Sequence, residues 1–358
     1  MMLQFHTDDR IGSWIVDHVL VFGEPALLAA HHIDSGQKAT LEVRNDLGLA
    51  RTGQNRVITA LQSFDHHAVP RLIEHGDDEG RLFIAMRPFS GDNLSDRMVS
   101  GGYDWQQACT WLYRVAQALQ HMHGVDWVHR DVNPQAIYVG NHDEAWLLGM
   151  ASALRVGEVP NSEIPKGNIS YLAPEVLADT SYDPMRADIY SFGCVAYELL
   201  RGESAFPAAA WAENADRERM MLDWKARAAA LDPGPAVPDW LRSLVRKCAH
   251  PEAEQRLPDM DSVMSWLEGS LGSWTLAEKA PAATPGIVPR RHLPPLTVQP
   301  TQWDPEAFAE AVAARALELQ EPEDRSEVFY AMAAAMGMAA GLALSVLSIL
   351  FVELAMLA

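Results

Sequence analysis

Cysteine is scarce in this chain, where Cys109, Cys194 and Cys248 are the only three among 358 residues. They stand far apart and lack the spacing of metal ligands, which argues against a disulfide framework and against a cysteine-based metal site. Their small number is typical of a protein from a reducing compartment.

Positive charge is also in short supply, because 28 Lys and Arg residues face 48 Asp and Glu residues and leave a net charge of −20. A nucleic-acid partner requires a basic face, so we expect none. The first ten residues have neither the basic start nor the apolar run of a signal peptide. We therefore expect the folded part of the chain in the cytoplasm.

Histidines occur in close pairs, but their places do not favour a metal. The pairs at 31–32 and 66–67 and the residues His121 and His123 fall at a strand end, in a loop and on a helix. We expect no metal site from them.

The most informative segment is 128–137, which carries His-Arg-Asp at 129–131. It resembles the catalytic loop of the protein kinases. The resemblance implies that Asp131 stands at the position of the catalytic base. Five residues later, where the family has a magnesium-binding Asn, this chain has Ala136.

Further segments resemble the same family in order and spacing. They are Ala-Pro-Glu at 173–175, the start of a long helix at 186–193, a late arginine segment at 251–256, and a strand and turn at 82–87 and 91–94. The resemblance covers roughly residues 14–270 and is closest to bacterial Ser/Thr kinases of eukaryotic type. It implies an α+β fold of two lobes, with a small antiparallel sheet lobe over 1–87 and a larger helical lobe over 88–273.

The groups that hold the phosphates of ATP are replaced. Kinases use a strand Lys that is paired with a helix Glu, and by alignment these positions hold Glu42 and Val57. Two like charges about 4 Å apart repel by a few kcal/mol at an intermediate dielectric, so Glu42 opposes ATP. Lys38 lies roughly 13 Å along the strand. Arg44 is nearer and stays open as a substitute, although we interpret both as solvated edge charges.

The magnesium ligands are missing as well. Gly149 occupies the Asp position of Asp-Phe-Gly, so with Ala136 both oxygen donors are absent. The glycine-rich turn of the family is represented by Leu20, Phe22 and Glu24. These side chains do not suit a phosphate cradle.

The parts that the chain keeps are structural ones. The resemblance implies that Arg130 braces the activation segment, that Glu175 pairs with Arg256, and that Asp188 fixes the catalytic-loop backbone. Broken buried pairs cost about 3–5 kcal/mol, which is reason enough to keep them. Asp131 is then interpreted as a vestigial base with local hydrogen bonds.

The end of the chain predicts a membrane anchor. A Pro-rich linker over 274–303 leads to a short amphipathic helix and acidic stretch over 304–327, and no charge occurs from 328 to 352. A helix of that length spans roughly 37 Å, which exceeds the ~30 Å of hydrocarbon. Gly337 and Gly341 have a spacing that permits helix pairing. A single-pass, tail-anchored protein is expected.

These observations lead to one main hypothesis and two rivals. The main hypothesis is a membrane-anchored pseudokinase that acts as a cytoplasmic binding or regulatory module toward a protein partner, with no cofactor. The first rival is a divergent Ser/Thr protein kinase that uses ATP and magnesium. The second is a nucleotide sensor that binds ATP without metal.

Overall fold

The computed structural model describes residues 4–23, 25–45, 49–89, 91–140, 144–160, 166–178, 181–207, 217–228 and 230–277. The chain divides into two compact units, Met1–Phe206 with Glu218–Arg290 and Pro207–Arg217 with Arg291–Ala358. The elements below belong to the first unit, apart from Arg217 at the start of one helix.

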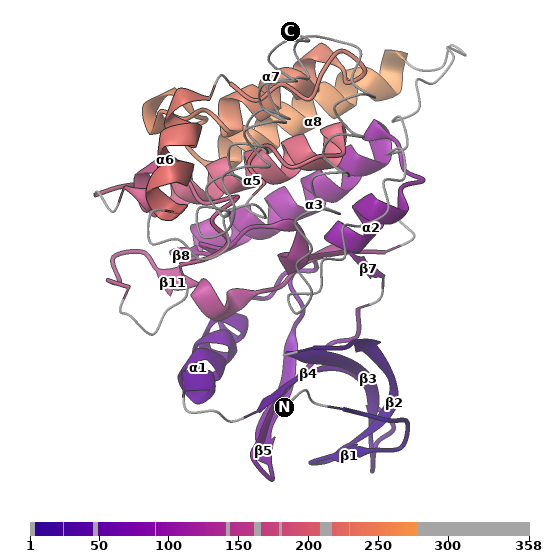
Figure 1. The fold of residues 1–358 in the computed structure, drawn as a ribbon. Helices are drawn as coiled ribbons and strands as arrows, with labels where there is room; N and C mark the ends of the chain where they lie inside the picture. Colours follow the sequence, from indigo (N-terminus) through magenta and orange to yellow (C-terminus); the bar gives the residue numbers. More distant parts are fainter. Residues whose placement is uncertain are drawn as a thin grey trace, which may run out of the picture. The chain divides into compact units, whose positions relative to one another are not determined.

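The N-terminal lobe is built on a six-stranded antiparallel sheet (Figure 1). Its spatial order is β1 (Arg10–Ile11), β2 (Trp14–Val21), β3 (Ala26–His32), β4 (Lys38–Asn45), β6 (Arg81–Met86) and β5 (Leu72–Asp78). One helix, α1 (Leu49–Gln62), lies between β4 and β5 in the chain.

Residue alternation along β4 gives the sheet two different faces. Ala39, Leu41 and Val43 enter the core of the lobe, where Trp14 and Phe83 are also buried. Because successive strand residues point to opposite faces, Thr40, Glu42 and Arg44 lie on the other face. The apolar side of the strand therefore fixes where its charged residues go.

The second lobe is mostly helical. Its helices are α2 (Leu94–Ser100), α3 (Trp105–Gly124), α4 (Pro174–Leu177), α5 (Pro184–Arg201), α6 (Arg217–Arg227), α7 (Asp239–Cys248) and α8 (Met260–Ala277). Its short strands are β7 (Asp92–Asn93), β8 (Trp127–Val128), β9 (Ile137–Val139), β10 (Ala145–Leu147) and β11 (Leu154–Arg155). Three single turns complete it, namely η1 (Pro134–Ala136), η2 (Met150–Ser152) and η3 (Ala253–Gln255).

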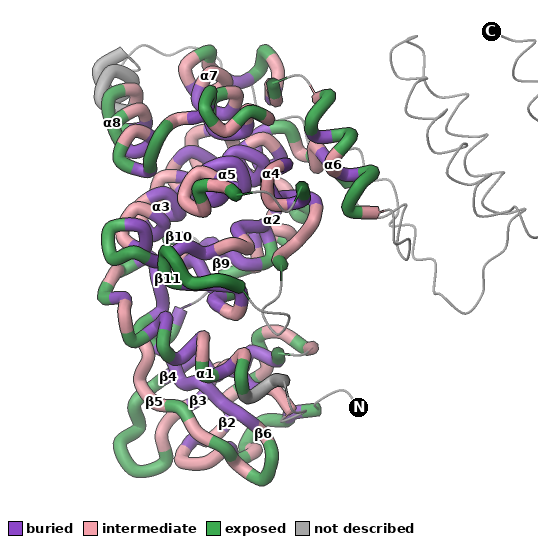
Figure 2. Tube along the Cα trace, turned by 90° about the vertical axis from the view of Figure 1, so that its left-hand side faces the viewer, coloured by how far each residue is buried: buried purple, intermediate pink, exposed green. Residues whose placement is uncertain are grey.

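Local sequence signals set the two long central helices. Asp104 caps α3 by accepting from Gln107 N at 2.9 Å, and Asp183 caps α5 with Pro184 at the first helical position. Gly202 ends α5 with φ 86°, a left-handed conformation that suits glycine. Figure 2 shows α5 largely buried, so this helix lies in the core of the helical lobe.

The C-terminal boundary differs from the one predicted. Helix α8 continues to Ala277, four residues into the range assigned to the linker from 274. No proline occurs between Pro258 and Pro281, so no proline in residues 274–277 stops the helix. The rest of the predicted linker, the segment 304–327 and the span 328–352 lie outside the described residues. Within the described part, no helix is both long and apolar enough to cross a bilayer.

Candidate functional site: the cleft and the catalytic-loop region

Glu42 and Arg44 form an ion pair on one face of β4. The exposed fractions of their side chains are 11% and 17%, so the pair is largely shielded from water. The expectation that Arg44 is a solvated edge charge was wrong, because i and i+2 side chains share a strand face and these two carry opposite charge. Lys38 is exposed, as expected. The guanidinium of Arg44 is thus engaged by the carboxylate at the position where a kinase has its Lys.

Helix α1 presents apolar and neutral groups at the position of the family's Glu. Val57 is 4% exposed, and the neighbouring Gln54 uses its side-chain amide to donate to Phe83 O at 3.0 Å. Arg56 Nη1 donates to Ala151 O of η2 at 3.3 Å, which ties α1 to the turn where Asp-Phe-Gly would stand. Backbone carbonyls on both lobes therefore hold the helix.

Ala136 and Gly149, the two positions that the family resemblance aligns with magnesium ligands, lie next to each other, and neither has a side-chain oxygen. A Cβ built on Gly149 would meet the Cβ of Ala136 at 3.1 Å, and Gly149 has φ +82°. The carbonyl of Ala136 already accepts from Leu148 N at 2.8 Å. Hard divalent cations need several oxygen donors. These two positions therefore do not fit magnesium.

Asp131 is held by hydrogen bonds on one carboxylate oxygen. Its Oδ1 accepts from Asn133 Nδ2 at 2.7 Å and from the backbone N–H of Asn168 at 2.8 Å. Burial raises the pKa of Asp131 above its ordinary value, and the bonds from Asn168 and Asn133 and the nearby His129 oppose that rise. The carboxylate thus joins the catalytic loop to the segment that contains Asn168.

Asp188 fixes the backbone of the same loop. Its carboxylate accepts from the backbone N–H groups of His129 and Arg130, each at 2.8 Å, and lies 3.0 Å from His123 Nε2. Burial disfavours its charge, but the hydrogen bond and the charge interaction with His123 hold its pKa below the ordinary value. Arg130 has φ 65°, an uncommon conformation that these bonds sustain, and its Nη1 donates to Ser152 O at 3.1 Å.

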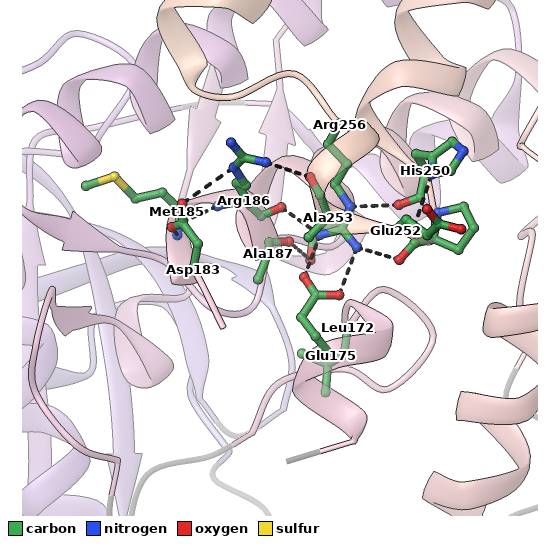
Figure 3. A network of polar contacts seen from close by, with 12 residues as sticks. Leu172, Glu175, Asp183, Met185, Arg186, Ala187, His250, Glu252, Ala253 and Arg256 are labelled. Atoms are coloured by element: carbon green, nitrogen blue, oxygen red, sulfur yellow. Dashed lines mark hydrogen bonds and ion pairs between the residues drawn. The ribbon is translucent and has the colours of Figure 1, made fainter. Parts of the chain in front are cut away.

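The pair of Glu175 and Arg256 anchors the end of the activation segment (Figure 3). Arg256 has no exposed side-chain surface, and its two terminal nitrogens donate to Glu175 at 2.5 and 2.8 Å. The same guanidinium donates to carbonyls of His250, Pro251 and Arg186. Every nitrogen of the buried cation therefore has a partner.

Phe89, Tyr138 and Trp146 form an aromatic cluster at the segment that follows β6 and leads from the sheet lobe to the helical lobe. Phe89, on that segment, is 7% exposed and stands 5.5 Å from Tyr138 and 6.0 Å from Trp146 between ring centroids. Its backbone N–H donates to Thr40 Oγ1 at 3.4 Å. Burial raises the pKa of the Tyr138 phenol and the Glu42 carboxylate adds to the rise, against a bond from Asn93.

The histidines are packed by other side chains. His66 stacks on His121 at 5.2 Å, with His67 alongside at 4.2 Å, while His123 bonds to Asp188. Burial, followed by the neighbouring His67, lowers the pKa of His66 to about 4. Among the residues described, no group of three or more potential ligands could hold a metal ion.

A model of the protein kinase domain matches residues 40–266, which is more than half of the 358 residues. The chain belongs to the protein kinase family. Its lobes and loops match the fold expected from the resemblance, with a curled antiparallel sheet followed by helices.

The similar proteins of this family include Ser/Thr kinases. Serine/threonine-protein kinase PknJ of Mycobacterium tuberculosis is 35% identical over 154 residues, which is 41% of this chain and 26% of PknJ. Calcium-dependent protein kinase 32 of Arabidopsis thaliana is 30% identical over 248 residues, 65% of this chain and 42% of the relative. The chain thus spans well under half of the length of these relatives.

Several functional contacts were not predicted from the sequence. Asn133 and Asn168, which bond Asp131, and Lys225, which is buried in α6, were not singled out. Arg56 was named only as part of a helix. The sequence around Lys225 gives no sign that this residue is buried. By contrast, Asn133 stands two residues after Asp131, a spacing that is typical of a local side-chain turn.

Proposed function

We propose that this protein is a membrane-anchored pseudokinase, a kinase fold that serves as a binding or regulatory module without phosphoryl transfer. The observation that carries the proposal is the close approach of Ala136 and Gly149, the two positions aligned with the magnesium ligands of kinases. A Cβ built on Gly149 would lie 3.1 Å from the Cβ of Ala136, and neither residue has a side-chain oxygen to offer a metal. A triphosphate without its metal loses the charge neutralisation on which phosphoryl transfer depends.

The charge at the phosphate end supports the same proposal. By the family alignment, Glu42 stands where the phosphates need a cation, and it holds Arg44 in an ion pair. An incoming phosphate would have to compete with this carboxylate for the guanidinium. The backbone N–H of Phe89 donates to Thr40, and the Phe89 ring is packed in the aromatic cluster. Phe89 therefore offers little to the adenine ring of ATP.

A divergent Ser/Thr kinase is the second candidate. Two observations favour it, namely the retained Asp131 in a loop braced by Asp188, and relatives that are named Ser/Thr kinases. A metal-independent nucleotide sensor is a third candidate, for which Arg44 would supply the cation beside Glu42 on β4.

Thermal-shift titration of the full chain with ATP separates the three candidates. The proposal predicts no shift with ATP alone, with Mg²⁺ or with Mn²⁺. A shift that needs no metal would favour the sensor. A metal-dependent shift, together with transfer of labelled phosphate, would favour the kinase and overturn the proposal.

Membrane anchorage is part of the proposal. It rests on the charge-free run over 328–352, with Gly337 and Gly341 placed for helix pairing. The partner is a protein at the inner face of the membrane. A pull-down of the full chain from detergent-solubilised membranes would identify it.

A further inference from the structure

Lys225 is an amine buried inside the helical lobe. It lies on α6 and has no exposed surface. Its Nζ donates to Ser170 O at 2.9 Å and to Leu172 O at 2.6 Å. The ring centroids of Tyr190 and Phe206 lie 5.3 and 4.9 Å from the same nitrogen. The cation is therefore held by two backbone carbonyls of the activation segment and by aromatic faces.

The groups around Lys225 do not pair its charge. Cys194 and Tyr190 face it from α5, Glu175 from α4, and Arg256 from the segment after η3. No ion pair joins it to a carboxylate in the described part of the chain. Burial lowers the pKa of Lys225 to about 8, while Cys194 and Glu175 favour the charged form and Arg256 opposes it. The two carbonyls are thus the main polar partners of the amine.

Hydrogen bonds continue from these carbonyls to the catalytic loop. The backbone N–H of Ser170 donates to Asn168 Oδ1 at 3.1 Å. The backbone N–H of Asn168 donates to Asp131 Oδ1 at 2.8 Å. Tyr171, between the two residues that bind Lys225, donates its hydroxyl to Glu198 of α5 at 2.5 Å. The segment 168–172 is therefore bound on one side to α6 and on the other to Asp131.

We propose that Lys225 is a latch that makes α6 and the segment 168–172 open as one unit, coupled to Asp131. If the segment 168–172 moves away from α6, the Lys225 amine loses both hydrogen-bond acceptors while it is still buried. That loss is costly for a charged group. The amine then has to reach water, and it takes α6 with it. A partner that binds α6 and moves it would therefore alter the hydrogen bonds of Asp131 through the segment 168–172. The latch acts whether or not the chain transfers phosphate.

Hydrogen exchange on the wild-type chain tests the latch directly. In increasing, sub-denaturing urea, the amides of 168–172 and those of 218–227 should exchange with one common opening free energy and one common urea dependence. Separate openings for the two segments would overturn the proposal. This measurement does not depend on how any variant folds.

Two lysine variants give the matched comparison. Lys225→Met keeps the bulk between the rings and removes the donors, so exchange at 168–172 should rise about tenfold, the size expected for a lost hydrogen bond. Lys247→Met is the control, because Lys247 is exposed and lies 5.6 Å from the Trp266 ring without a role in the latch. No change in Lys225→Met, or an equal change in the control, would contradict the latch.

A distant readout separates coupling from a merely structural lysine. Asp131→Ala removes the acceptor of the Asn168 amide, and no hydrogen bond within the described residues joins Asp131 to α6. The latch predicts faster exchange at 218–227 in Asp131→Ala, and little further increase at 218–227 when Lys225→Met is added. Unchanged exchange of α6 in Asp131→Ala would overturn the coupling.

Discussion

Single residues decide what the region of Glu42, Ala136 and Gly149 is proposed to bind. By the family alignment, Glu42 stands where kinases have a Lys, and Ala136 and Gly149 stand where they have two magnesium ligands with side-chain oxygens. These losses stay predictions from the sequence, because each follows from residue type at an aligned position. The bond partners could not be predicted in this way. Alternation along β4 puts Arg44 and Glu42 on one face, but it does not decide whether a long side chain turns to water or to its neighbour.

Gly149→Ala should destabilise the fold for two reasons. A left-handed backbone costs a non-glycine residue about 1–2 kcal/mol, and the new Cβ would lie 3.1 Å from that of Ala136. Gly36→Ala is the matched control, since Gly36 has φ +67° and nothing within 4 Å of its Cβ. In urea denaturation the free energy of unfolding should fall more for position 149 than for position 36. The reverse order would mean that the two metal-ligand positions are not crowded.

Asp131→Asn should leave the free energy of unfolding at pH 7 unchanged or raise it. The folded-state pKa of Asp131 is raised, chiefly by burial, so the folded chain binds the proton more tightly than the unfolded chain. Stability from this group is therefore present at low pH and is lost as pH rises through the folded pKa. An Asn cannot ionise and still offers an oxygen to Asn168.

Asp131→Ala is the comparison for that prediction. It leaves the Asn168 amide without its acceptor, at a cost of about 1–3 kcal/mol. Urea denaturation of both variants between pH 4 and pH 7 measures the difference. Equal losses in the two variants would show that the carboxylate charge, rather than its hydrogen bonds, holds the segment.

Helices and strands were predicted where family motifs mark them. The start of a long helix expected at 186–193 lies within α5 (Pro184–Arg201), and the strand expected at 82–87 is β6 (Arg81–Met86). Less could be predicted between elements. Glu175 and Arg256 meet as the family resemblance implied, whereas the bond from Arg56 to η2 and the bonds from Lys225 to 170–172 join segments far apart in the chain. Residue spacing gives no information on such contacts.

Arg256→Ala should destabilise the anchoring of α4 strongly. It removes a cation with no exposed side-chain surface from its pair with Glu175, and breaking a buried pair costs about 3–5 kcal/mol. Arg201→Ala is the control, because Arg201 and Glu203 form an exposed pair, with 47% and 59% of their side chains accessible, and such pairs contribute below about 1 kcal/mol. Chemical denaturation of both variants measures the two losses. Similar values would contradict the buried role of Arg256.

The whole chain joins a kinase fold to a C-terminal region that the structure leaves undescribed. The kinase fold was predictable because motifs recur in family order over roughly residues 14–270, and the protein kinase domain model matches residues 40–266. The extent of α8 was not, because a helix without a proline stop can run past the end of a motif.

Removing residues 328–358 should release the protein from membranes. The charge-free run over 328–352 is long enough to cross the hydrocarbon layer. In fractionated cells we expect the full chain in the carbonate-resistant membrane pellet and the shortened chain in the supernatant. The melting temperature of the kinase domain should be the same in both. Recovery of the full chain in the supernatant would refute the anchor.

Transfer of labelled phosphate from ATP tests the central claim most directly. The full chain is incubated with γ-labelled ATP and Mg²⁺ or Mn²⁺, with the Asp131→Ala variant and a known active kinase beside it. Ala136 and Gly149 have no side-chain oxygen for a metal, and position 42 is a Glu rather than a Lys. The account therefore predicts no incorporation of labelled phosphate above the level of Asp131→Ala. Metal-dependent incorporation that disappears in Asp131→Ala would contradict it.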